Sequence, residues 1–295
     1  MSAFQFRLNP PFGDLSRCSA LLNGVAQRYR VELYRTTLSL KSVTRGAALY
    51  VTRQGRHLVT EDSFLILNQG QEYALEFQWP TTTETLCPFF QPGFVEQIAG
   101  SRSTAAARQL DEIEMPAPIT DFPERLYPKS GPLAALLHGL RRDLGTPAVC
   151  APWLEDRFYG LASALVKFRN HTRDEIDEFP GRRPATRAEL YRRLHRGRDF
   201  LSACHAEPLT VALAARAAHM SPYHFHRMFK RAFRQTPMQF LQEYRLRSAR
   251  RLLATTDEQV TTIALAVGFE SLGSFSWLFR RRFGLSPRQF RADHA

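Results

Sequence analysis

The chain has 295 residues and a formal net charge of +12, from 40 Lys or Arg against 28 Asp or Glu. This length is enough for two domains, and no apolar run is long enough to cross a bilayer. The N-terminus has prolines and charges where a signal peptide needs an apolar core, so we expect a cytoplasmic protein with no membrane partner. Four widely separated cysteines argue against a disulfide framework and a zinc site.

Residues 1–115 are rich in β-branched, aromatic and aliphatic residues that occur in short runs. Turn residues such as Gly46 and Asn68-Gln69-Gly70 separate these runs. The pattern predicts a β sandwich or small barrel. The expected strands cover 31–40, 47–53, 56–60, 63–68, 72–77 and 83–90.

A low-polarity stretch at the end of these strands is a candidate effector pocket. Cys87 and Phe89 can line an apolar pocket, to which Tyr73 and Glu84 would add polar contacts. The alternative is that Cys87 and Phe89 belong to the core, and a thiol-sensing role for Cys87 is a third reading. His57 is the only histidine of residues 1–115, and it is expected on the surface or in a hairpin. We therefore expect no metal and no cofactor.

Prolines between 115 and 132 predict a connector. It is followed by two apolar stripes with helical spacing, and 116–180 is expected to hold a helical pair. The first stripe is Leu133, Leu136, Leu137, Leu140 and Leu144; the second is Leu154, Phe158, Leu161, Leu165 and Phe168. Such a pair can pack on the strands or against a second copy of the chain, so a homodimer stays open.

The segment RDEIDEFPGRRPAT, residues 173–186, combines acids, Pro-Gly and basic residues and predicts a flexible linker. Beyond it the charge changes, because residues 187–295 contain nineteen Lys or Arg against eight Asp or Glu. A polyanion is the natural partner of this basic half, since neutralising phosphates releases counterions. A basic surface kept for solubility is the alternative.

The basic half contains one helical pattern twice, at an offset of fifty positions. The matched pairs are Ala214/Ala264, Ser221/Ser271, Phe225/Phe275, Phe229/Phe279, Arg231/Arg281, Phe233/Phe283, Pro237/Pro287, Gln239/Gln289 and Phe240/Phe290. Each copy predicts two helices joined by a short turn, and the second helix of each has an apolar face and a more polar one. The apolar face would hold the helix down, and the other face would be free to enter a groove.

Capping signals predict where these helices begin. Ser221 precedes Pro222 at the start of the second helix of the first copy, and Ser271 lies just before the second helix of the second copy, as N-cap residues do. Thr236-Pro-Met-Gln239 and Ser286-Pro-Arg-Gln289 have capping-box spacing, so another helix follows each copy. The helix from Thr236 to about Ala254 would span about 28 Å, close to the roughly 34 Å between successive major-groove turns on one DNA face.

These segments resemble the DNA-binding domain of the AraC/XylS family of bacterial transcription regulators. The resemblance covers about residues 187–292 and rests on AARAAHMSPYHFHRMFKRAF and on GFES, FRRRFG and SPRQFR in order. It implies a domain over 186–292 with helix-turn-helix units at about 209–234 and 260–284. By the same resemblance, 1–115 would be a cupin-like sensing barrel, giving an α+β protein with an all-α C-terminal domain. The family's partners would be double-stranded DNA, RNA polymerase and a small-molecule effector.

The resemblance assigns DNA contacts to the second helix of each unit. These residues are Tyr223, His224, His226, Arg227, Lys230, Arg231, Ser271, Leu272, Ser274, Ser276, Trp277, Arg280 and Arg281. We expect Arg227 and His226 to read base edges. The later arginines, Arg282 included, are expected at phosphates or on the surface, with Glu243 as an alternative partner for Arg231 or Arg281.

The first unit departs from the second at its turn. The turn AAHMS of the first unit lacks the glycine that Gly268 supplies in the second, so His219 is expected to adopt an unusual backbone conformation.

No phosphate loop, nucleophile elbow or paired metal-ligand spacing argues for catalysis, so we expect no enzyme activity. The sequence therefore predicts a transcription regulator, more specifically an activator, whose N-terminal domain responds to a small molecule. The alternative is control by a protein partner through the 133–144 leucine stripe. A third reading, an enzyme fused to a DNA-binding domain, has no motif in its favour.

Overall fold

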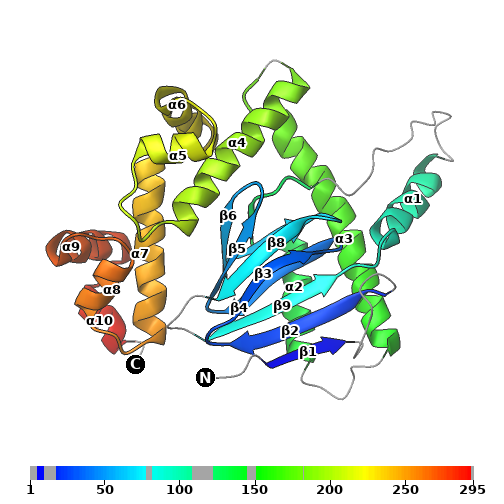
Figure 1. Ribbon diagram of the computed structural model, residues 1–295, viewed down its shortest axis with the longest axis horizontal. Helices are drawn as coiled ribbons and strands as arrows, with labels where there is room; N and C mark the ends of the chain where they lie inside the picture. Colours follow the sequence, from blue (N-terminus) through cyan, green and yellow to red (C-terminus); the bar gives the residue numbers. More distant parts are fainter. Residues whose placement is uncertain are drawn as a thin grey trace. The chain divides into compact units, whose positions relative to one another are not determined.

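The computed structural model describes residues 5–9, 18–77, 82–107, 122–144, 151–181 and 183–293. The chain divides into two compact units, Met1–Arg192 and Arg193–Ala295, which run from blue to green and from yellow-green to red in Figure 1. Of the predicted connector, residues 115–121 lie outside the described residues, as does Cys150. The prediction is wrong for the rest of it, because 126–128 form a strand and a helix begins at Gly131. Within the described part, no helix has the length and apolar character needed to span a bilayer.

The first unit contains two antiparallel sheets that face each other. The six-stranded sheet has, in order, β1 (Gln5–Asn9), β2 (Ala20–Ala26), β9 (Thr83–Phe89), β4 (Ser39–Arg45), β7 (Ser63–Leu67) and β10 (Leu126–Pro128). The four-stranded sheet has β3 (Arg30–Arg35), β8 (Glu72–Phe77), β5 (Ala47–Thr52) and β6 (Arg56–Thr60). The predicted β sandwich is confirmed.

Strand β7 explains why this sandwich has two separate apolar layers. Successive side chains of a strand point to opposite faces. Accordingly, Leu65 and Leu67 pack between the two sheets, whereas Phe64 and Ile66 pack on the outer face of the six-stranded sheet. Strand β7 is therefore buried on both faces, which accounts for its unbroken apolar sequence.

Three helices cover that outer face (Figure 1). They are α1 (Phe94–Ala107), α2 (Gly131–Asp143) and α3 (Ala151–Asp177). Leu133, Leu137 and Leu140 of α2 and Leu161 of α3 are buried in the same cluster as the sheet side chains. Of the two possibilities for the leucine stripes, the structure has packing within the subunit.

The run 31–40, which the sequence predicts as one strand, forms parts of two strands in different sheets. Strand β3 pairs with β8, and β4 pairs with β7 and β9. The chain crosses from one sheet to the other at 36–38, where Thr36 accepts a hydrogen bond from the Gly70 N–H. The alternation of apolar and polar residues in 31–40 does not reveal this crossing, because the parts of the run that belong to β3 and β4 both contain apolar residues.

Of the two expectations for His57, the hairpin is confirmed, because His57 lies on β6 opposite Tyr50 of β5, and the surface position is wrong. The His57 side chain is buried, and its Nε2 lies 2.8 Å from Oε1 of Glu124. The same carboxylate accepts a hydrogen bond from Gln71 Nε2 at 2.6 Å. Because Glu124 lies 67 positions further along the chain, no local pattern around His57 reveals this buried polar contact.

The flexible linker predicted for 173–186 is also wrong at both ends. Helix α3 continues to Asp177, and α4 (Pro184–Ala203) begins at Pro184. The acidic residues Asp174, Glu175 and Asp177 occupy the last turns of a long helix, so the run of charges misled the prediction.

The second unit is entirely helical after α4. Its helices are α5 (Val211–Ala217), α6 (Pro222–Phe233), α7 (Pro237–Thr255), α8 (Val260–Ala266), α9 (Leu272–Phe283) and α10 (Pro287–Ala292). Helices α5 and α6 form one helix-turn-helix unit, α8 and α9 form the other, and α7 joins them. This confirms the all-α domain with two units and a long connecting helix.

Candidate nucleic-acid interface

Helix α6 packs into the second unit through one aromatic face. Phe225 and Phe229 are fully buried, and their ring centroids lie 5.3 Å apart. Phe233 continues the contact at 4.6 Å from Phe229. The opposite face is exposed, and it carries Tyr223, His224, His226, Arg227, Lys230 and Arg231. All six residues expected to contact DNA from this helix therefore reach solvent.

Helix α9 repeats this arrangement. Phe275 and Phe279 are fully buried with ring centroids 5.6 Å apart, and Phe283 lies 4.7 Å from Phe279. The expected contact residues Ser271, Leu272, Ser274, Trp277, Arg280 and Arg281 are exposed, and Ser276 is half-buried. We call α6 and α9 the reading helices.

The predicted caps are present at the start of both reading helices. The Ser221 hydroxyl accepts a hydrogen bond from the His224 N–H, and the Ser271 hydroxyl accepts one from the Ser274 N–H. Both capping boxes are also formed, at Thr236 for α7 and at Ser286 for α10. These local bonds fix where each helix begins, so they also fix which side chains come first on its exposed face.

The turns of the two units need the same left-handed backbone. His219 has φ 52° in the first unit, as the sequence predicts, and Gly268 has φ 93° in the second. A Cβ at Gly268 would lie 2.7 Å from the His205 carbonyl oxygen and 2.9 Å from the Arg245 guanidinium. The second turn is therefore restricted to glycine by both conformation and space.

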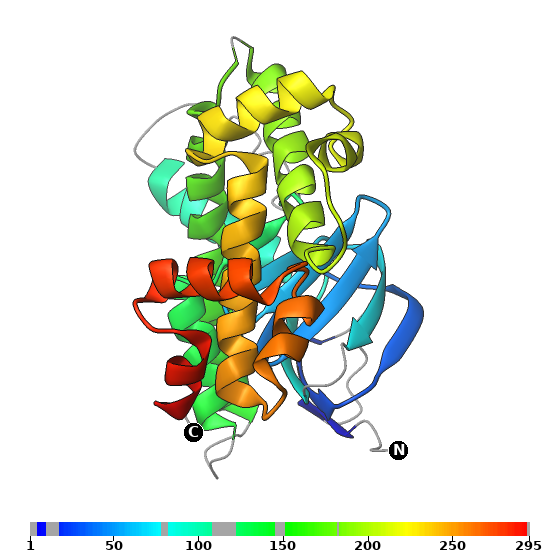
Figure 2. The same cartoon turned by 90° about the vertical axis from the view of Figure 1, so that its left-hand side faces the viewer.

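The axes of the reading helices are nearly parallel within the second unit. Figure 1 views both almost end-on, and Figure 2 shows both from the side, the yellow α6 above the orange-red α9. They are stepped along α7, which runs across them. Helix α7 has 19 residues, a length of about 28 Å at roughly 1.5 Å per residue.

One acid ties α9 to the connecting helix. Glu243 of α7 accepts hydrogen bonds from Arg282 at 2.8 Å and from Arg247 at 3.1 Å. Burial raises the pKa of Glu243, but the hydrogen bonds and charges of these two arginines outweigh it and lower the pKa overall. Glu243 therefore pairs with Arg282, and not with Arg231 or Arg281, the partners that the sequence suggests.

The remaining cations of the reading helices have no acidic partner in the described part of the chain. No carboxylate there lies within 4 Å of Arg227, Lys230 or Arg231, nor of Arg280 or Arg281. The Arg227 guanidinium lies 5.8 Å from the Tyr223 ring centroid, and that of Arg281 lies 5.2 Å from the ring centroid of Trp277. These charges are available to an external anion.

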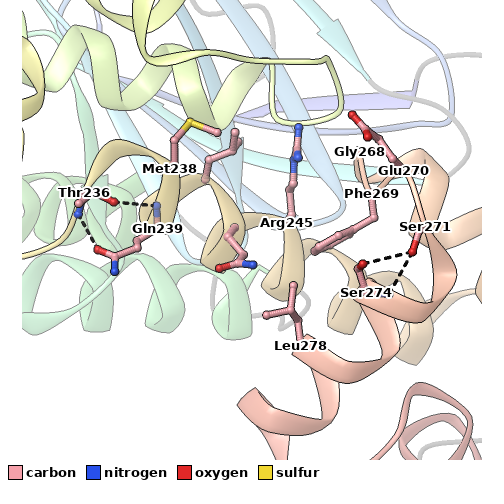
Figure 3. A pocket seen from close by; sticks show the side chains of 12 residues that line it. Thr236, Met238, Gln239, Arg245, Gly268, Phe269, Glu270, Ser271, Ser274 and Leu278 are labelled. Carbon is pink, nitrogen blue, oxygen red and sulfur yellow. Dashed lines mark hydrogen bonds between the residues drawn. The ribbon is translucent and has the colours of Figure 1, made fainter. Parts of the chain in front are cut away.

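A hollow lies between the first turns of α7 and the N-terminus of α9 (Figure 3). Gln242 and Arg245 line it from α7 and Ser274 from α9, together with the N-cap residues Thr236 and Ser271 of these helices. Arg245 is fixed here, since it donates hydrogen bonds to the His205 and Glu207 carbonyl oxygens at 2.7 and 2.8 Å. Glu270 also lines the hollow, so its carboxylate offsets the charge of Arg245 beside the N-terminus of α9.

Comparisons with known proteins agree with this geometry. Residues 214–293 match the family described as a helix-turn-helix domain. The activator RhaS of Escherichia fergusonii is 47% identical over 66 residues, which are 22% of this chain and 24% of RhaS. The regulator AlkR of Acinetobacter baylyi is 38% identical over 96 residues, which are 32% of this chain and 31% of AlkR. The chain carries an AraC/XylS-type DNA-binding domain.

A solved AraC-type regulator from Chromobacterium violaceum is 32% identical, with a TM-score of 0.35, over 37% of this chain and 96% of that chain. The chain spans less than half the length of the curated relatives it matches. The likeness to these relatives therefore concerns the AraC/XylS-type domain and not the β sandwich.

Three of the four candidate effector residues lie together inside the β sandwich that precedes the AraC/XylS-type domain. Tyr73, Cys87 and Phe89 are buried around Lys41, a residue the sequence analysis missed. The fourth lies apart, because the Glu84 carboxylate binds Arg141 at 2.9 Å. The signal that could reveal Lys41 is its position one residue after Leu40, which faces the helices, so that Lys41 must face the other sheet.

Proposed function

We propose that this protein is a sequence-specific DNA-binding transcription regulator whose reading helices enter consecutive major grooves of one duplex. The observation that carries the proposal is the pair of near-parallel capped helices, each with an exposed face of cations that have no acid beside them in the described residues. Two such helices about one DNA turn apart are the geometry that dimeric helix-turn-helix proteins use. Here one chain would supply both.

The N-terminal β sandwich would regulate this binding by responding to a small-molecule effector. Relatives named transcriptional activators, RhaS and NphR, support an activating role. RNA polymerase would then be a partner once the protein is on DNA. Control by a protein partner has less support, because the leucine stripe that motivated it is covered by the protein's own sheet and α3.

Base reading by Arg227 gives the most specific test. An arginine that donates two hydrogen bonds to guanine contributes roughly 1 to 3 kcal/mol of discrimination. We expect Arg227→Ala to lose preference at one position of a binding site selected from random duplexes. Arg288→Ala, on the exposed surface of α10, is the control and should keep the wild-type preference. Uniformly weaker binding with an unchanged preference would show that Arg227 contacts only phosphate.

Arg281 and Arg282 are adjacent but have different surroundings, so variants of the two can distinguish a contact with DNA phosphate from an ion pair within the protein. Arg281 has no acid nearby among the described residues, whereas Arg282 is bound by Glu243. We expect Arg281→Ala to flatten the dependence of log K on log salt concentration by about one unit. Arg282→Ala should leave that slope nearly unchanged. Titrations of a fluorescent duplex at several salt concentrations measure both, and equal slopes for Arg281→Ala and wild type would refute the phosphate role.

A further inference from the structure

A lysine is buried between the two sheets of the first unit. Lys41 is on β4, and only 1% of its surface is exposed. Its neighbour Leu40 packs on the helix side of the sheet and Val43 packs between the sheets, so strand alternation directs Lys41 into the interior. Lysine is almost never fully buried without a paired charge.

The surroundings of Lys41 are aromatic and come from three further strands. Its Nζ lies 3.9 Å from the ring centroid of Phe89 and 3.4 Å from the Tyr73 hydroxyl, to which it donates a hydrogen bond. Tyr50 and Cys87 complete the group, with the Tyr50 hydroxyl 3.9 Å from the Cys87 Sγ. We call these five residues the Lys41 cluster.

The cluster does not supply the negative charge that an ammonium needs. No carboxylate of the described residues lies within 4 Å of Nζ. The hydrogen bond to Tyr73 uses one of the three N–H donors of the Lys41 ammonium. Aromatic rings attract a cation, but this attraction is weaker than the loss of hydration on burial. Burial accordingly lowers the pKa of Lys41 to about 7, although Cys87 opposes the shift.

The open edge of the sandwich lies next to this cluster. Strand β3 is at the edge of the four-stranded sheet, and its pairing with β8 is irregular between Val31 and Tyr34. Tyr34 pairs with Tyr73, its ring centroid lies 5.8 Å from that of Tyr73, and 40% of its surface is exposed. One layer of aromatic side chains therefore separates the Lys41 cluster from solvent on this side.

We propose that Lys41 binds the carboxylate of a small organic acid inside the β sandwich, with the rings of Tyr73 and Phe89 against the apolar body of the acid. This deepens the proposed regulatory function, on which it rests, by naming the chemical class of the effector. A monocarboxylate fits because the cluster has one cation, Lys41, to meet a single negative charge. A phosphate group carries about two negative charges at pH 7 and would need a second cation. The acid supplies the counter-charge that the described residues lack.

Binding of model acids to the full-length protein tests this. Benzoate, hydrocinnamate and octanoate are compared with their amides by thermal unfolding and calorimetry at constant ionic strength. We expect at least one acid to raise the midpoint of unfolding while its amide does not, because only the acid pairs with Lys41. In Lys41→Met the response should disappear, and in Tyr73→Phe the affinity should fall several-fold.

Lys129→Met is the matched control, since Lys129 Nζ binds the Val43 carbonyl oxygen instead of joining the cluster. It should respond to the acid as the wild type does. The proposal is overturned if no acid of the panel binds, if the amide stabilises equally, or if Lys41→Met responds like wild type. Affinity for DNA, measured without acid in the same preparations, separates this outcome from a failure of the regulator proposal.

Discussion

Replacing Phe279 by alanine is expected to remove the second reading helix as a folded element. Phe279 is fully buried, and its ring contacts those of Phe275, Phe283 and Phe290 at centroid distances of 4.7 to 5.7 Å. Truncating a buried phenylalanine costs about 3 to 5 kcal/mol, because apolar contact is lost and a cavity remains. This is a large part of the stability of a small domain.

Urea unfolding followed by circular dichroism at 222 nm measures that loss, and duplex titration measures its effect on DNA affinity. Affinity for a full-length site should fall to the level of a duplex that carries only the first unit's half. Leu272→Ala is the control on the same helix, since Leu272 is exposed and its loss should change stability by less than about 0.5 kcal/mol. A loss below about 1 kcal/mol for Phe279→Ala would contradict the packing described here.

Replacing Lys41 by methionine is expected to stabilise the protein most at pH 6 and below. The pKa of Lys41 is lowered to about 7, with burial as the main cause. Below pH 7 the folded protein therefore holds a buried ammonium that methionine avoids, and the gain has an upper bound of about 5 kcal/mol. Methionine fills a similar volume without a charge.

The sign of the pH dependence follows from proton binding. Between about pH 7 and pH 10 the unfolded chain keeps a proton on Lys41 that the folded chain has released. Wild-type stability should therefore rise with pH in this window relative to Lys41→Met, by at most about 1.4 kcal/mol per pH unit. Urea unfolding of both proteins at pH 6, 7, 8 and 9 measures the difference. A methionine variant that is less stable at pH 6 would show that Lys41 supports the fold.

The DNA-binding unit could be predicted from the sequence because its signals are local. Ser221 with Pro222 and the capping box at Thr236 mark helix starts within four residues of themselves. The repeat at fifty positions then aligns Phe229 with Phe279, and both are buried. The left-handed turn at His219 could be expected because the first turn lacks the glycine that the second turn has at Gly268, although the offset of fifty places Gly268 opposite Ala218.

The β sandwich could be predicted only in outline, because its important contacts join distant parts of the chain. The Lys41 cluster draws on four strands, from β4 to β9, and no spacing within one strand brings Lys41 to Cys87. His57 depends in the same way on Glu124. Glu84 was predicted beside Cys87 because the two are close in sequence, but its carboxylate binds Arg141 of α2.

Guanine methylation protection on a selected duplex tests most directly whether one chain reads two grooves. With saturating protein, we expect two protected major-groove segments on one face of the DNA, with centres about 10 base pairs apart. Phe279→Ala should remove one segment and leave the other. A single protected segment with the wild-type protein, or two on opposite faces of the duplex, would contradict the binding of both reading helices to one face of the DNA.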